Sequence, residues 1–179
     1  MSETLRILGI DPGLRHTGWG VIEQTGSRLS HIAHGVIRID TGLSLAARLG
    51  GIFEAIGLLT AEYQPQIGGV EETLVNANPR SALKLGQARG VAMAALHSAG
   101  LDVFEFSPRT IKLAVVGTGA ADKTQVGFMV ARLLPKAGKL PSDAADALAA
   151  LFRAGPMGRQ RARRLDSYPW AHANRRCVT

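Results

Sequence analysis

The chain has 179 residues, one cysteine (Cys177), 46% hydrophobic residues and a formal net charge of +7 at pH 7. These values are typical of one globular domain with a sizeable core, and they exclude a fibrous or wholly disordered chain. One cysteine cannot form an internal disulfide, and no apolar stretch approaches the roughly 20 residues of a membrane span. The first residues lack the basic and apolar segments of a secretory signal. We therefore expect a cytoplasmic protein with no membrane association.

Three strands are expected in the first forty residues. Short apolar or alternating runs cover 5–10, 18–23 and 29–39, with turns around Gly13 and Gly26 between them. Because the turns are tight, these strands are expected to pair as antiparallel neighbours.

The rest of the body alternates helix and strand and then ends in helices. Apolar residues at three- and four-residue spacing predict the helices, and short apolar runs predict the strands. The expected elements are a helix from Leu45 to before Gln64, a strand at 66–71, a helix from Pro79 to Ser98, a strand at 101–106, and helices at 108–116, 122–134 and 142–153. This order predicts an α/β fold with a mixed five-stranded sheet, three strands antiparallel and the others parallel, flanked by helices.

Basic residues are concentrated at the C-terminal end. Residues 1–152 carry 14 Lys and Arg against 13 Asp and Glu, whereas residues 153–179 carry seven arginines against one acid, Asp166. Hydrophobic periodicity also stops after Gly155. We therefore predict one domain at 1–154 and an Arg-rich, disordered tail at 155–179. The tail could be merely solvated or could add a nucleic-acid contact, and the sequence leaves both open.

Four acidic residues lie where a fold of this type would bring carboxylates together. Asp11 ends the first strand, Glu71 ends the fourth, and Asp143 and Asp146 are one turn apart at the start of the last helix. Clustered carboxylates repel one another, so burying them costs stability unless cations are bound. Oxygen ligands favour Mg²⁺ or Mn²⁺ over Zn²⁺. Two such ions, roughly 3.5–4 Å apart, can hydrolyse a phosphodiester.

Each acid also has a structural interpretation. Asp11 precedes Pro12 and Gly13 and could start a turn, and Asp143 suits the first turn of a helix. Asp146 interrupts an alanine and leucine stripe, and Glu71 follows an apolar strand, so these two are harder to explain by structure alone. A purely structural interpretation must hold separately at all four positions.

The sequence resembles the RuvC family of crossover-junction endodeoxyribonucleases, within the ribonuclease H-like superfamily. The resemblance covers about residues 6–153 and rests on four segments: GIDPGLRHTGWGVI (9–22), VEETLVNANPRSALKLGQARGVA (70–92), VVGTGAADKTQV (115–126) and DAADALA (143–149). It implies a homodimeric enzyme that resolves Holliday junctions in DNA recombination and repair. Paired, Mg²⁺-dependent incisions would leave 5′-phosphate ends, and the enzyme would work alongside the RuvA–RuvB branch-migration complex.

The resemblance also assigns roles by position. It makes the four acids the catalytic, metal-binding residues, with two Mg²⁺ ions per site and Mn²⁺ as a possible substitute. Other positions are implied to contact phosphate or DNA: Lys112, Lys123, Leu74, Arg80 and Arg109. Gly86 and Gly90, four apart on one helix face, suit the close approach of another backbone, either within the chain or across a two-fold axis. The resemblance implies that this helix contributes to the dimer interface. Leu74 departs from the family, which commonly has phenylalanine there. An aliphatic side chain can wedge between bases but offers no aromatic face.

Three alternatives remain at the level of sequence. A ribonuclease H-like nuclease acting on structured RNA would share the first strand, but such chains lack the SALKLGQARG segment. A junction-binding scaffold without activity would not need all four acids. A sugar kinase or actin-like ATPase shares a distant version of the strand order, but its chains are about twice as long.

Overall fold

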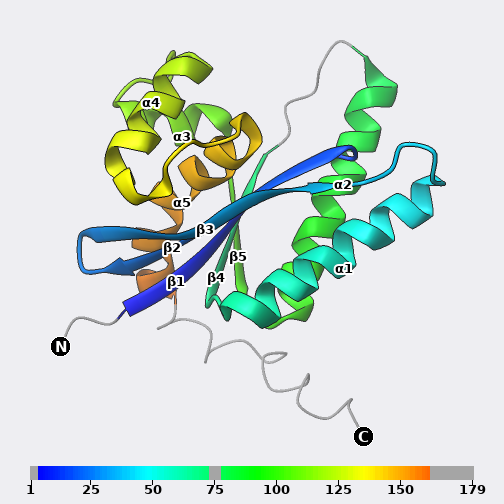
Figure 1. Ribbon diagram of the computed structural model, residues 1–179, viewed down its shortest axis with the longest axis horizontal. Coiled ribbons are helices and arrows are strands. Elements are labelled where there is room, and N and C mark those ends of the chain that lie inside the picture. Colours follow the sequence, from blue (N-terminus) through cyan, green and yellow to red (C-terminus); the bar gives the residue numbers. More distant parts are fainter. Residues whose placement is uncertain (1–3, 73–77, 162–179) are drawn as a thin grey trace, which may run out of the picture.

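The computed structural model describes residues 4–72 and 78–161, except for the side chains of residues 153–161. One five-stranded sheet forms its centre, with strand order β3-β2-β1-β4-β5 (Figure 1). The strands are β1 (Thr4–Asp11), β2 (His16–Thr25), β3 (Arg28–Arg38), β4 (Ile67–Glu71) and β5 (Asp102–Phe106). β1, β2 and β3 pair antiparallel, whereas β4 is parallel to both β1 and β5. The predicted mixed sheet is confirmed.

Helices cover both faces of the sheet (Figure 1). One face carries α1 (Leu45–Tyr63) and α2 (Pro79–Ser98). The other carries α3 (Pro108–Val116), α4 (Lys123–Leu133), the short 3₁₀ helix η1 (Pro135–Ala137) and α5 (Ser142–Arg161). Each face has its own apolar core, because the buried strand residues alternate between the two sides. Every predicted helix and strand is present.

The boundary of the last helix differs from the prediction. α5 continues to Arg161, through Gly155 and Pro156, and so enters the segment predicted as a disordered tail. Both residues are poor helix formers, which is why the sequence favoured an end at 153. An existing helix propagates at much lower cost than a new one nucleates, and the first half of α5 is already fixed by packing.

Glycines in the central strands allow α5 to lie directly on the sheet. A Cβ atom at Gly9 would overlap the carbonyl oxygen of Ala147, and one at Gly20 would overlap the side chain of Leu148. Gly18 leaves the same kind of space for the first turn of the helix. The sequence of β1 and β2 therefore fixes how closely the acidic first turn of α5 approaches the end of β1.

Candidate active site

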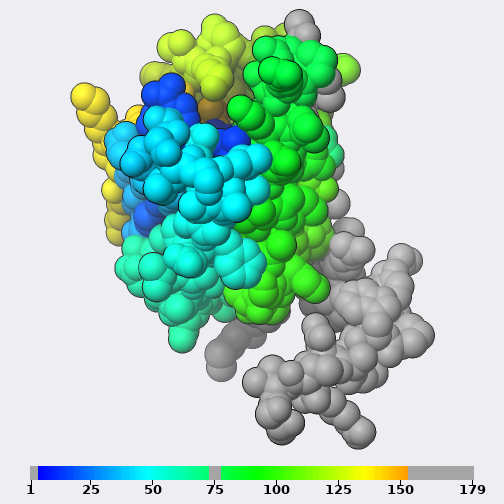
Figure 2. Space-filling view, turned by 90° about the vertical axis from the view of Figure 1, so that its right-hand side faces the viewer, coloured from blue at the N-terminus to red at the C-terminus, as the bar shows by residue number. Residues whose placement is uncertain are grey.

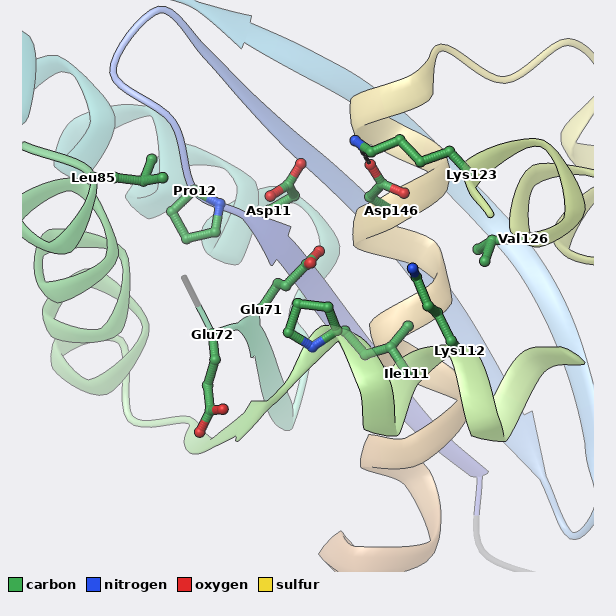
Figure 3. A pocket seen from close by; sticks show the side chains of 11 residues that line it. Asp11, Pro12, Glu71, Glu72, Leu85, Ile111, Lys112, Lys123, Val126 and Asp146 are labelled. Carbon is green, nitrogen blue, oxygen red and sulfur yellow. Dashed lines mark hydrogen bonds and ion pairs between the residues drawn. The ribbon is translucent and has the colours of Figure 1, made fainter. Parts of the chain in front are cut away.

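Three of the four predicted acids line one cavity at the carboxyl ends of β1 and β4. Asp11 ends β1 and Glu71 ends β4, and these strands are neighbours because Ile10 pairs with Val70. Asp146 reaches the same space from α5, and Figure 3 shows the three carboxylates pointing toward one another. The cavity has a volume of about 380 Å³. Its wall is formed by Asp11, Pro12, Glu71, Glu72, Leu85, Pro108, Ile111, Lys112, Lys123, Val126 and Asp146.

Asp143 lies beside the cavity rather than in its wall. Its backbone packs against Gly18, which is the register partner of Asp11 on β2. Its carboxylate is close enough to raise the pKa of Asp11 by charge repulsion. The structure thus brings all four predicted acids into one electrostatic group, with Asp143 at its edge.

Burial and mutual repulsion strongly favour the protonated forms of two of these acids. Burial, followed by the charges of Asp146 and Asp143, raises the pKa of Asp11 to about 7. Burial, followed by the charges of Asp11 and Asp146, raises the pKa of Glu71 to about 8. Lys123 acts in the opposite direction on both groups. The cavity is therefore short of positive charge at neutral pH.

Lys123 and Lys112 form the basic side of the cavity (Figure 3). The Nζ atom of Lys123 donates a hydrogen bond to Oδ2 of Asp146 at 3.0 Å. Lys123 is the first residue of α4, and a capping box between Asp122 and Gln125 fixes the start of that helix. Lys112, on α3, is half-buried and lowers the pKa of Glu71. Both lysines are placed where they can offset the charge of a phosphate.

The acidic groups of the cavity offer only oxygen atoms as metal ligands. Among the described residues, no three acidic, histidine or cysteine side chains are gathered closely enough to hold a metal ion as they stand. Asp11, Glu71 and Asp146 nevertheless line one cavity with their carboxylates. The raised pKa values of Asp11 and Glu71 indicate that the negative charge of this cavity is not compensated. Such oxygen ligands suit Mg²⁺ or Mn²⁺.

The other predicted contacts lie outside the cavity. Arg80 and Arg109 are exposed near the starts of α2 and α3, and neither lines the cavity. Leu74 is outside the described residues. Gly86 and Gly90 lie on α2, and no described atom comes within 4 Å of a Cβ placed at either one. No close neighbour within the described chain therefore explains these glycines.

Some residues near the site were not identified from the sequence. Glu72 lines the cavity, although Figure 3 shows its carboxylate turned away from the three central acids. Arg89 of α2 forms an ion pair with Glu105 of β5, and Glu72 further raises the pKa of Arg89. This pair ties α2 to the strand beside Glu71. Its partners are sixteen residues apart in different elements, so no periodic pattern indicates the pairing.

The fold and this cavity define a nuclease of the ribonuclease H-like class: acids from two adjacent parallel strands and a helix, with lysines beside them. A family model described as "Crossover junction endodeoxyribonuclease RuvC" matches residues 7–152. The chain belongs to the RuvC family.

Individual comparisons agree with this assignment. A protein of Hyphomonas neptunium named crossover junction endodeoxyribonuclease RuvC is 72% identical over 149 residues, covering 83% of this chain and 89% of the relative. The protein of the same name from Caulobacter vibrioides is 57% identical, covering 80% and 85%. Among solved structures, T. thermophilus RuvC in complex with Holliday junction substrate gives a TM-score of 0.77 at 31% identity, covering 83% of this chain and 91% of that one.

Family membership confirms the predicted enzyme class. The chain is a DNA endonuclease of the Holliday junction resolvase type, which makes it a hydrolase, and the RNA-directed and ATPase alternatives are set aside. The structure adds that no helix among residues 4–72 and 78–161 is long and apolar enough to cross a membrane.

Proposed function

We propose that the chain resolves four-way DNA junctions as a homodimer, by paired metal-dependent incisions. One observation carries the proposal: carboxylates from β1, β4 and α5 converge in a single cavity that also has two lysines in its wall. Hydrolysis of a phosphodiester requires positive charge near its oxygens, and this cavity provides both lysines and a set of oxygen ligands for cations.

The four acids are proposed to hold two Mg²⁺ ions, or Mn²⁺ in their place. Asp11, Glu71 and Asp146 would be the direct ligands, and Asp143, at the edge of the group, would complete the set. When bound, the cations would supply an activated water and stabilise the leaving oxygen. Cations would also hold Asp11 and Glu71 in their ionised forms at neutral pH, against the effect of burial.

The lysines are proposed to neutralise the scissile phosphate. Lys123 is three-quarters exposed, so its ammonium group can leave Asp146 and reach a phosphate without a large desolvation cost. Lys112 is half-buried and faces Glu71 across the cavity (Figure 3). Arg80, Arg109 and Leu74 are proposed to contact DNA outside the cavity, on the arms or the crossover.

The α1 and α2 face is proposed as the dimer interface. Figure 2 shows these helices side by side across one face of the molecule. The face carries exposed apolar side chains, with Phe53 at 42%, Leu58 at 72% and Leu83 at 66% exposure. Gly86 and Gly90 have open space above them, which allows another backbone to approach. A two-fold dimer would present two cavities to a junction that is itself nearly two-fold symmetric.

The cellular setting follows from the same proposal. We expect a cytoplasmic enzyme that works with a RuvA–RuvB branch-migration complex. The basic segment at 153–179 either adds a contact with DNA or is only solvated. Comparing the salt dependence of junction binding with and without residues 155–179 decides between these, since each neutralised phosphate contributes about 0.9 to the slope.

The experiment that tests the proposed function compares substrates. The full chain is incubated with Mg²⁺ and an end-labelled synthetic four-way junction, a linear duplex of the same sequence, its single strands, or a structured RNA. Cleavage of the junction alone supports the proposal. Preferred cleavage of the RNA would show that the substrate is RNA and not a DNA junction. Tight junction binding without cleavage in Mg²⁺ or Mn²⁺ would indicate a junction-binding scaffold without activity.

A further inference from the structure

A second surface groove begins at the candidate active site and runs along α4. It shares Lys123 and Asp146 with the catalytic cavity, so the two hollows meet at this ion pair. Beyond the pair, the groove passes between α4 and the loop that leads into α5. Its further lining includes Thr124, Phe128, Lys139 and Ser142.

The segment that borders this groove is basic, although Asp146 also lines the groove where it meets the catalytic cavity. The twenty residues from Lys123 to Ser142 contain Lys123, Arg132, Lys136 and Lys139 and no acidic residue. The side chains of these four are exposed. The body of the chain outside the C-terminal segment is otherwise nearly neutral, with 14 basic against 13 acidic residues in 1–152. A polyanion that enters the catalytic cavity would therefore be attracted along this side of the molecule.

Phe128 gives the groove an aromatic wall. Its side chain is 64% exposed in the middle of α4, with the groove on one side and a shallow apolar hollow beside Met129 on the other. An exposed phenylalanine between basic side chains is the combination that binds nucleic-acid strands, because the ring packs on a base or sugar while cations pair with phosphates. α3, α4 and the loop before α5 lie together on the face of the sheet opposite α1 and α2 (Figure 1). This groove is thus separate from the proposed dimer face.

We infer that this groove holds the DNA strand as it continues from the scissile phosphate, with Phe128 packing on a nucleotide and Lys139 pairing with a phosphate. The inference rests on the proposed function, since it takes the cavity at Asp146 as the place of cleavage. Continuity with the cavity and the basic residues of the 123–142 segment favour DNA over a protein partner as the occupant.

Measurements of DNA binding distinguish the packing of Phe128 on a nucleotide from the pairing of Lys139 with a phosphate. Anisotropy of a fluorescent four-way junction is followed with the full chain in buffer without divalent cations, at several salt concentrations. Phe128→Ala should weaken binding at least about five-fold and leave the salt slope unchanged, because stacking is not ionic. Phe128→Trp should restore affinity, whereas Phe128→Leu should not. Lys139→Ala should lower the salt slope by about 0.9, as expected for one lost phosphate contact.

Two matched controls lie outside the groove. Leu133→Ala removes another exposed apolar side chain of α4 that does not line it, and Arg28→Ala removes a charge at the far end of the sheet. The inference is overturned if Phe128→Ala and Lys139→Ala behave like these controls while the wild-type chain binds and cuts the junction. It is also overturned if Phe128→Ala changes the sedimentation mass instead of DNA affinity, because the groove would then be a protein interface. A wild-type chain that neither binds nor cuts the junction would instead refute the proposed function.

Discussion

Asp143 lies directly against Gly18, with no space between them for a side chain on β2. A Cβ atom at Gly18 would overlap the carbonyl oxygen and crowd the Cβ atom of Asp143. Gly18 is also the register partner of Asp11. This single contact therefore fixes how far the acidic turn of α5 stands from the acid that ends β1.

Replacing this glycine should separate the acids. Gly18→Ala forces the start of α5 off the sheet, at a cost of roughly 1–3 kcal/mol in the free energy of unfolding. Junction cleavage should fall at least ten-fold, even where thermal denaturation shows a folded protein. Gly50→Ala is the control for folding: nothing outside the surrounding helix lies within 4 Å of a Cβ there, so this variant should gain stability. Full cleavage by Gly18→Ala would show that this spacing does not matter.

The metal-free protein should lose stability as the pH rises. Asp11 and Glu71 have folded-state pKa values of about 7 and 8, above their ordinary values of 3.8 and 4.5. Between about pH 4 and pH 8 the folded state therefore binds more protons than the unfolded state, and stability falls with pH. Thermal unfolding in EDTA at pH 5, 6, 7 and 8 measures this. Glu71→Gln should flatten the dependence and raise Tm at pH 8; an identical dependence in both proteins would contradict the prediction.

Divalent cations should reverse this loss. At pH 8 Mg²⁺ should raise the Tm of the wild-type chain, because a bound cation compensates the ionised carboxylates. The same addition should raise the Tm of Asp11→Asn less, since one ligand is lost. Equal shifts in the two proteins would mean that Mg²⁺ binds elsewhere.

The ion pair of Lys123 and Asp146 should matter for cleavage and hardly for stability. The lysine side chain is 76% exposed, and exposed pairs contribute under about 1 kcal/mol. Lys123→Ala should therefore change the free energy of unfolding by less than that amount and reduce cleavage at least ten-fold. Asp146→Asn should abolish cleavage and retain junction binding. An Asp146→Asn protein with unchanged activity would remove Asp146 from the proposed site.

The dimer can be tested without damaging the fold of the subunit. Gly90→Leu places a large side chain where the described chain leaves open space, and leucine is a better helix former than glycine. The subunit should therefore remain folded while the dimer dissociates, as measured by sedimentation equilibrium. Such a monomer should nick one strand of a junction and leave it unresolved. An unchanged dimer would place the interface away from α2.

Much of the site could be predicted because local patterns decide it. Asp11 and Glu71 each end an apolar run, and the order of elements places those runs on adjacent parallel strands, so their meeting followed from the sequence. The spacing of Asp143 and Asp146 also put both on one side of a helix. Asp146 lies in the cavity and Asp143 at its edge because of the way α5 is rotated against the sheet. The spacing of the two acids alone does not determine that rotation.

Other features required the folded chain. The pairing of Arg89 with Glu105 joins a helix to a strand, and charges of this kind are common on any surface. Phe128 is one apolar residue in an amphipathic helix, where periodicity favours burial, yet it is exposed. The continuation of α5 to Arg161 also contradicts local propensity at Gly155 and Pro156.

Mapping the incisions on a four-way junction tests paired cleavage most directly. Each of the four strands is end-labelled in turn, and the products formed in Mg²⁺ and in EDTA are sized beside those of Asp146→Asn. Cuts at symmetric positions in two opposing strands, present only with Mg²⁺ and absent in the variant, are expected. A single nick per junction, or cutting that persists in EDTA, would contradict a metal-dependent dimer with two matched sites.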